Sequence, residues 1–222
     1  MRFLCLHGMG SNARIFKQQT AALRYELGEG HSYDFVDGPV PWEIDHDLDQ
    51  LAMGEEQTYA ICDPNSASSC VAAMENIERY IATEGPYDGI MAFSQGASIT
   101  LGWMIYKQRE AKSGSLQHLP FKVGVFFSNP WRVYDGKALA EDRLAFMDPK
   151  DFEGLLDLPT AHIWGSADKD HAMAQAISTS CVADKRSVFV HERGHEIPAK
   201  SDTVILMARA INRAIAQAVP AE

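Results

Sequence analysis

The sequence predicts an α/β protein built on one parallel, doubly wound sheet. Apolar runs of strand length alternate with helical patterns from one end of the 222-residue chain to the other. Runs such as KVGVFFS, at 122–128, are β-branched, aromatic and uninterrupted, which is typical of strands covered on both faces. Hydrophobic residues make up 46% of the chain, enough for a substantial core. We therefore expect a single domain over 1–222 with a mostly parallel, six-stranded sheet.

The predicted elements follow one another in simple alternation. The six predicted strands are 2–6, 33–37, 88–93, 122–128, 160–165 and 187–191. The predicted helices are 13–27, a stretch from Cys70 to the Gly85-Pro86 pair, 95–110, about 170–181, and a closing segment with an apolar face from Val204 to Ile215. In a sheet of this kind the loops that carry function follow the carboxyl ends of the strands.

Two long stretches, 38–68 and 129–158, have mixed composition and no clear period. We interpret both as irregular, pocket-lining regions, because loops of this length in a compact domain are usually functional. An apolar-lined cleft suits an acyl group. The candidate substrate-binding residues in these regions are Val40, Trp42, Trp131 and Phe146.

Charge and cysteine content exclude several classes of function. Lys and Arg total 20 against 30 Asp and Glu, giving a formal net charge of -10 without a basic tract, so we expect neither nucleic acid nor a membrane surface as a partner. The opening apolar run is too short for a signal peptide, and a cytoplasmic protein is expected. The four cysteines show no metal-binding spacing, which favours reduced, buried thiols and no metal or cofactor.

The stretch AFSQGAS, at 92–98, lies where a predicted strand turns into a helix. A turn tight enough to push a side chain out over the sheet edge needs small neighbours, and Ala92 and Gly96 flank Ser94 at two residues on either side. The pattern matches G-x-S-x-G, with alanine in the first small position, as in the nucleophile elbow of α/β-hydrolases. An alternative is an ordinary strand-helix junction with serine as the helix N-cap.

A nucleophilic serine needs a base, and the base needs a carboxylate to orient it. Asp168 follows the predicted strand 160–165, and His195 follows the predicted strand 187–191 in a Gly-containing loop. The chain order Ser94, Asp168, His195 is the order expected of α/β-hydrolases. These three residues are therefore the candidate catalytic triad.

Other aspartates and histidines lie near the same strands, and their positions distinguish them from Asp168 and His195. Asp170 is expected to cap the following helix, so Asp168 is favoured as the acid. His162 is expected inside a strand as a buried, hydrogen-bonded side chain, His171 in a first helical turn, and His191 packed or on the surface. His195 is the histidine placed on a loop.

Acyl transfer also needs donors for the developing oxyanion. The backbone N–H of Gln95, which follows the candidate nucleophile, is the first expected donor. The second should come from the loop after the first strand, LHGMGSN, and by position we assign it to Met9. Taken alone, H-G-x-G is equally well a flexible turn.

With these residues in place, the chain resembles the fungal serine hydrolase (FSH) family of α/β-hydrolases. The resemblance is carried by RFLCLHGMGSNARIF, FVDGPVP, YDGIMAFSQGA, IWGSAD and ERGHEIP, which occur in family order over nearly the whole chain. It implies an α/β-hydrolase fold without a separate cap domain and the triad Ser94, Asp168 and His195. One departure is ERGH, where a doubled glycine before the histidine is common.

The expected function is cofactor-free hydrolysis of small-molecule acyl thioesters or esters. Resemblance to stand-alone hydrolases of fungal polyketide pathways implies release of a polyketide-type acyl product in secondary metabolism, with a polyketide synthase acyl-carrier protein as a possible partner. Two alternatives stay open: a small-molecule carboxylesterase without a carrier protein, and a ligand-binding protein on a hydrolase scaffold. The basic residues Lys107, Arg109 and Lys112 form a cluster near the nucleophile helix, and are expected at its far end.

Overall fold

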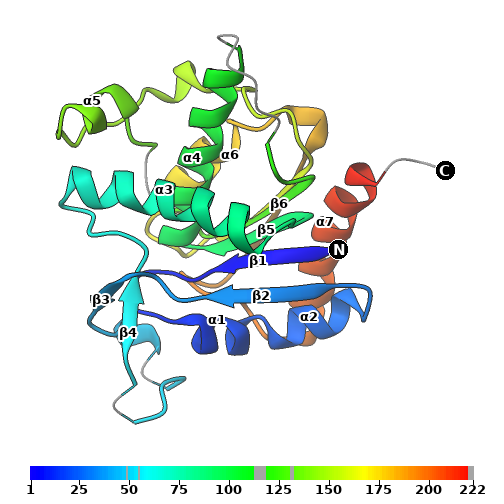
Figure 1. The fold of residues 1–222 in the computed structure, drawn as a ribbon. Coiled ribbons are helices and arrows are strands. Elements are labelled where there is room, and N and C mark those ends of the chain that lie inside the picture. The colour runs from blue at the N-terminus through cyan, green and yellow to red at the C-terminus, as the bar shows by residue number, and fades with distance from the viewer. Residues whose placement is uncertain (49, 55, 113–118, 131–132, 220–222) are drawn as a thin grey trace.

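The central feature is a six-stranded sheet, seen here in a computed structural model that describes residues 1–222 apart from 49, 55, 113–118, 131–132 and 220–222 (Figure 1). Its strands are β1 (Arg2–Leu6), β2 (Ser32–Val36), β5 (Gly89–Phe93), β6 (Val123–Phe127), β7 (Thr160–Gly165) and β8 (Arg186–His191). All neighbours pair in parallel, in the order β2-β1-β5-β6-β7-β8. The predicted fold class and all six predicted strands are confirmed.

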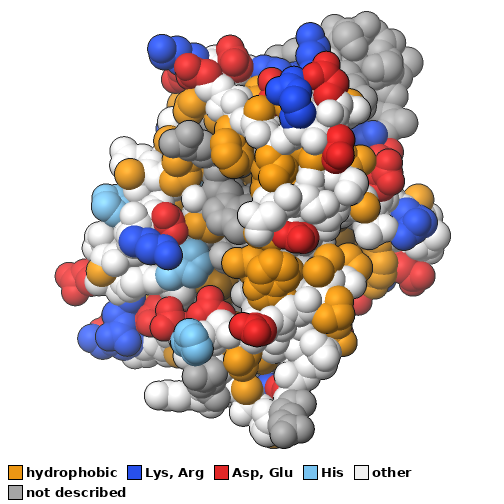
Figure 2. All heavy atoms as spheres, turned by 90° about the vertical axis from the view of Figure 1, so that its left-hand side faces the viewer, with side chains coloured by type: hydrophobic (Ala, Val, Ile, Leu, Met, Phe, Trp, Pro, Cys, Tyr) orange, Lys and Arg blue, Asp and Glu red, His pale blue; other side chains and the backbone are white. Residues whose placement is uncertain are grey.

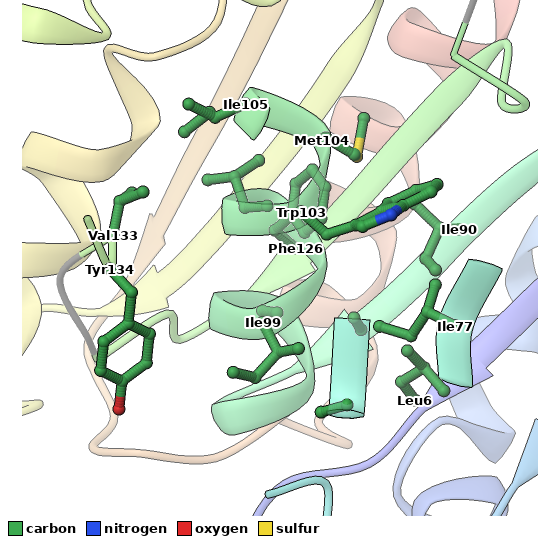
Figure 3. Packing of buried hydrophobic residues seen from close by; sticks show 14 of the residues in the cluster. Leu6, Ile77, Ile90, Ile99, Trp103, Met104, Ile105, Phe126, Val133 and Tyr134 are labelled. Carbon is green, nitrogen blue, oxygen red and sulfur yellow. The ribbon is translucent and has the colours of Figure 1, made fainter. Parts of the chain in front are cut away.

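Helices cover both faces of the sheet (Figure 1). One face carries α1 (Ala13–Gln19), α2 (Ala21–Leu27) and α7 (Ser201–Ala218), and the other carries α3 (Ala67–Glu84), α4 (Gln95–Lys112) and α6 (His171–Ser178). Side chains alternate between the two cores: along β1, Leu4 and Leu6 pack toward α3, whereas Phe3 and Cys5 pack toward α7. Figure 3 shows the core between α4 and the sheet. In the described part of the chain, no helix has the length and apolarity needed to span a bilayer.

The predicted helix over 13–27 is two helices. Thr20 separates α1 from α2, and its backbone has φ -91° and ψ 1°. The buried Thr20 hydroxyl donates to the carbonyl of Phe16 at 2.8 Å, a back-bond that competes with regular helix geometry. Because the break leaves the apolar residues on one side, hydrophobic periodicity could not reveal it.

The two regions predicted to be irregular contain short regular elements. Within 38–68, β3 (Val40–Trp42) pairs antiparallel with β4 (Thr58–Ala60), and the 3-10 helix η1 (His46–Leu48) lies between them. The region 129–158 contains α5 (Gly136–Ala140) and the 3-10 helix η2 (Pro149–Asp151); a further one, η3 (Ala183–Lys185), precedes β8. Elements of three to five residues are too short to show a period, so the sequence pattern could not predict them.

The first turn of α4 packs directly against the carboxyl end of β1. A Cβ atom added at Gly96 would lie 2.6 Å from the carbonyl oxygen of His7 and 2.7 Å from that of Leu6. Backbone atoms cannot give way as a side chain can. Gly102, further along the same helix, has room: a Cβ there would meet no atom closer than 3.8 Å.

These two glycines predict opposite effects of the same substitution. Gly96→Ala should lower the free energy of unfolding by roughly 1–3 kcal/mol, because the methyl group collides with backbone. Gly102→Ala, the matched control, should leave it unchanged or raise it by up to about 1 kcal/mol through helix propensity. Urea unfolding followed by circular dichroism measures both; equal effects would contradict the close approach of α4 to β1.

His162 lies inside β7 and is buried, as predicted, but it is not fully hydrogen-bonded. Its Nε2 has no hydrogen-bond partner among the residues that the structure describes, and its ring centroid lies 5.4 Å from that of Phe126, with the two rings tilted. Burial, with the charge of Arg186 adding to it, lowers the pKa of His162 from 6.5 to about 3. The imidazole is therefore neutral in the folded protein over the whole neutral and mildly acidic range.

This shift predicts a loss of stability in acid. Between pH 6.5 and 3 the unfolded chain binds a proton at His162 that the folded chain does not, so the free energy of unfolding falls as pH is lowered, by up to about 1.4 kcal/mol per pH unit from this group. In His162→Leu the slope should decrease by that amount. Denaturant unfolding at intervals between pH 6.5 and 4.5 measures the slope; an unchanged slope would exclude a neutral buried His162.

Candidate active site

Ser94 occupies the turn between β5 and α4 with a left-handed backbone. Its φ is +51°, a conformation that costs a non-glycine residue of order 1–3 kcal/mol. The turn is held from below by the Ser94 N–H, which donates to the carbonyl of Phe127 in β6 at 3.0 Å. Gly8 lies against it: a Cβ there would be 3.0 Å from the Ser94 Cβ. The glycine at position 8 therefore allows the loop after β1 to pack against the strained turn at Ser94.

The structure brings Ser94, His195 and Asp168 together in one hydrogen-bonded chain. The Ser94 hydroxyl lies 2.9 Å from His195 Nε2, and His195 Nδ1 lies 2.7 Å from Asp168 Oδ2. Because a carboxylate only accepts, Nδ1 carries the proton and Nε2 is left to accept from the serine. The Asp168 side chain is 1% exposed and the His195 side chain 24% exposed, so the acid is sealed while the base reaches the surface.

Asp168 and Asp170 both precede α6, and their hydrogen bonds distinguish them. Asp168 Oδ1 accepts the backbone N–H of Asp170 at 2.9 Å, which fixes the carboxylate and leaves Oδ2 for the histidine. Asp170 is the N-cap residue of α6, as predicted, although its side chain makes no capping hydrogen bond. The geometry therefore selects Asp168 as the partner of His195.

The other histidines weighed against His195 make different contacts. His171 begins α6 and its Nδ1 contacts the carbonyl oxygen of Asp168 at 2.8 Å. His191 is buried, and its Nδ1 accepts the N–H of Arg193 at 3.2 Å. Burial lowers the pKa of His191, which favours a neutral, packed ring.

The two backbone amides expected to donate to an oxyanion belong to Gln95 and Met9. Gln95 follows Ser94 at the N-terminus of α4, and Met9 follows Gly8 in the loop after β1. Among the residues that the structure describes, neither amide donates a hydrogen bond to a protein acceptor. The loop itself is fixed, because the N–H groups of Gly10 and Ser11 both donate to the carbonyl of Tyr59 in β4.

His7 and the side chain of Gln95 support this arrangement and were not assigned from the sequence. His7 is fully buried; its Nε2 accepts the N–H of Gly38 at 2.8 Å, so Nδ1 must carry the proton that it donates to the carbonyl of Gly8 at 2.7 Å. Burial lowers its pKa and keeps the ring neutral. His7 therefore ties the glycine loop to Gly38, the second residue after β2.

The Gln95 amide group clamps the segment that follows β4. Its Oε1 accepts the N–H of Ile61 at 2.7 Å, and its Nε2 donates to the carbonyl of Cys62 at 2.9 Å. Gln95 is 0% exposed, so this pair of hydrogen bonds is shielded from water. In the sequence, the only sign of this role is an amide side chain next to the candidate nucleophile. Its hydrogen-bond partners lie more than thirty residues away, so no local pattern identifies them.

The four predicted substrate-binding residues lie in the two long regions that follow β2 and β6. Val40 and Trp42 are half-buried on β3. Phe146 is 49% exposed, stacks on Tyr134, and lines a cavity beside α6 that contains no triad residue. Trp131 lies outside the described residues. Substrate binding by these four residues stays a prediction.

Two sequence comparisons agree with this geometry. The family model described as Serine hydrolase (FSH1) matches residues 1–206. Esterase FPY3 of Fusarium mangiferae is 36% identical over 223 residues, covering 99% of each chain. The probable esterase tazC of Aspergillus terreus is 28% identical over 240 residues, covering 95% of this chain and 90% of the relative. Related fungal proteins are thus esterases by name.

Solved structures show the same fold at low identity. Arabidopsis thaliana SOBER1 superposes with a TM-score of 0.57 at 16% identity, covering 97% of this chain and 99% of that one. Zea mays acyl-protein thioesterase 2 gives a TM-score of 0.56 at 16% identity, covering 94% and 92%. The predicted α/β-hydrolase fold is confirmed, and with the match over residues 1–206 the chain belongs to the FSH1 serine hydrolase family.

Proposed function

We propose that the chain hydrolyses carboxylic esters and thioesters of small apolar acids through an acyl-enzyme formed on Ser94. The single observation that carries the proposal is the continuous hydrogen-bonded chain from Ser94 through His195 to the sealed carboxylate of Asp168. Membership of a serine hydrolase family supports the same reaction class.

In the first half of the reaction His195 acts as general base. Its Nε2 takes the proton of the Ser94 hydroxyl while the oxygen attacks the carbonyl carbon of the substrate. Asp168 stabilises the imidazolium that forms and holds its tautomer. The Met9 and Gln95 amides donate to the oxyanion of the tetrahedral intermediate. His195 then returns the proton to the leaving alcohol or thiol, and the acyl-serine remains.

In the second half a water molecule replaces the leaving group. His195 Nε2 removes a proton from the water as it attacks the acyl-serine carbonyl, and the same two amides stabilise the second oxyanion. Collapse of this intermediate breaks the bond to Ser94 Oγ, which regains its proton from His195. The products are the free acid and the restored enzyme, so atoms and charge balance without a cofactor.

The face of the molecule at the carboxyl ends of the strands favours an apolar acyl group. Figure 2 views the molecule from the carboxyl-end side of the sheet, and hydrophobic side chains gather across the middle of this face with charged ones around them. Resemblance to family members of fungal polyketide pathways extends the proposal to polyketide-type acyl groups. Activity on thioesters and a role in secondary metabolism belong to the same proposal.

One observation favours substrates that are free small molecules over acyl groups on a carrier protein. Acidic carrier proteins require a basic rim, and the basic cluster of α4 begins at Lys107, thirteen residues after Ser94, or roughly 20 Å along the helix. Lys107 pairs with Glu78 at 2.9 Å, and Arg109 donates to the carbonyl of Asp151. A carboxylesterase without a carrier partner is therefore the second candidate function.

Fluorophosphonate labelling followed by intact mass tests the nucleophile. The wild type should gain one adduct, and Ser94→Ala should gain none and lose at least about 10⁴-fold in kcat on p-nitrophenyl esters and N-acetylcysteamine thioesters. The matched control, Ser201→Ala at the exposed start of α7, should label and turn over as the wild type does.

Three results would count against the proposal. An adduct that persists in Ser94→Ala would place the nucleophile elsewhere. Labelling without turnover on any ester or thioester would favour a ligand-binding protein on a hydrolase scaffold. Turnover of esters alone, with acyl thioesters untouched, would establish the carboxylesterase and remove the thioester part.

A further inference from the structure

A groove runs between α3 and the edge of the sheet formed by β1 and β2. Its floor consists of Leu4, Leu6, Val36 and Ile77, and it encloses about 330 Å³, within the range of small-molecule sites. Figure 3 shows Leu6 and Ile77 from this part of the core. None of Ser94, Asp168 and His195 lines it. The α3 groove, as we name it, is thus separate from the candidate triad.

The shape of the α3 groove suits a linear chain. On α3 its lining extends from Ala73 to Thr83, ten residues apart, which corresponds to about 15 Å of helix. Leu4 and Ile77 are buried beneath it, so the floor offers apolar contact along that length. An extended alkyl chain lying parallel to α3 would remove both surfaces from water.

The two ends of the α3 groove carry opposite charges. Arg79 stands at the rim; its guanidinium donates to Asn76 Oδ1 at 2.5 Å and, among the described residues, makes no ion pair. A guanidinium has five N–H donors, so most remain for a ligand. Asp37 lines the other end, beyond the carboxyl end of β2, where its Oδ1 accepts the N–H of Ala13.

The direction of α3 keeps these charges apart. Arg2, at the start of β1, donates to the carbonyl of Glu84 at the last residue of α3, so the C-terminal half of α3 lies at the amino ends of the strands. Arg79 belongs to that half. If a linear ligand binds Arg79 through one terminal carboxylate, its other end points toward Asp37. A second carboxylate at that end would face a like charge.

We propose that the α3 groove binds a linear monocarboxylic acid, with its carboxylate on Arg79 and its alkyl chain along the floor of Leu4, Leu6, Val36 and Ile77. The charge at Asp37 disfavours a dicarboxylic acid. The hydrolysis proposed above would release an acid of this class. Only the identification of the ligand with the reaction product rests on the proposed function. The binding site itself stands on the groove and its charges.

Two residues that line the α3 groove are hydrogen-bonded to side chains of the candidate active site. Ile61 lines the groove and donates its N–H to Gln95 Oε1, and Gly38 lines it and donates its N–H to His7 Nε2. A bound acid would therefore contact residues one hydrogen bond away from the two side chains that hold the oxyanion loop and the helix start. Product of the reaction would be retained beside, but not in, the catalytic centre.

Isothermal titration with sodium decanoate tests the site without any need for activity. The wild type should bind decanoate at one site, and Arg79→Glu should weaken binding by about tenfold or more, because a charged hydrogen bond becomes a repulsion. Asn76→Trp, at a half-exposed position of the rim, should weaken it similarly by filling the groove. Decanol, which has no carboxylate, should bind more weakly than decanoate and be insensitive to Arg79→Glu.

Matched controls separate the groove from the rest of the surface. Glu75→Trp lies on an exposed position of the same helix outside the groove, and Arg213→Glu reverses an exposed charge on α7; both should bind decanoate within about twofold of the wild type. No heat up to the solubility of decanoate would overturn the proposal. Binding that is unaffected by Arg79→Glu and Asn76→Trp would also overturn it, because the acid would then occupy another site such as the catalytic pocket. Loss of activity in Ser94→Ala bears on neither result.

Discussion

The left-handed backbone at Ser94 is the constraint on which the rest of the site depends. With φ at +51°, the residue turns the chain from β5 into α4 within one step and presents its hydroxyl at the sheet edge. Such a turn leaves no space for side chains beside it, which accounts for glycine at 8 and 96. The same crowding brings the β1 loop against the start of α4. Gln95 and Met9, whose amides we propose as oxyanion donors, directly follow Ser94 and Gly8 in the chain.

Hydrogen bonds hold the segments around Ser94 in place and offset that strain. His7 ties the glycine loop to Gly38, the Gln95 side chain clamps Ile61 and Cys62, and Asp168 is held by the N–H of Asp170. The bonds made by His7 and Gln95 are buried, where leaving a donor or acceptor unpaired costs about 1–3 kcal/mol. The site is thus stabilised by side-chain hydrogen bonds that are not themselves part of the proposed reaction.

Sequence patterns identified the parts of the molecule that depend on local chemistry. The six strands of the main sheet were predictable because short runs rich in apolar, aromatic and β-branched residues alternate with helical patterns, and the chain order of Ser94, Asp168 and His195 followed from their places after strands. The three-residue strands β3 and β4, the break at Thr20 and the clamp of Gln95 were not predictable, because each depends on partners distant in sequence or on a single hydrogen bond.

A crystal structure of the protein with a fluorophosphonate adduct on its nucleophile is the most direct test of this mechanism. We expect phosphorus on Ser94 Oγ and a phosphoryl oxygen about 2.7–3.1 Å from both the Met9 and Gln95 amide nitrogens, with His195 still hydrogen-bonded to Asp168. A phosphoryl oxygen turned toward solvent, or contacted by other donors, would contradict the assignment of these amides and with it the mechanism.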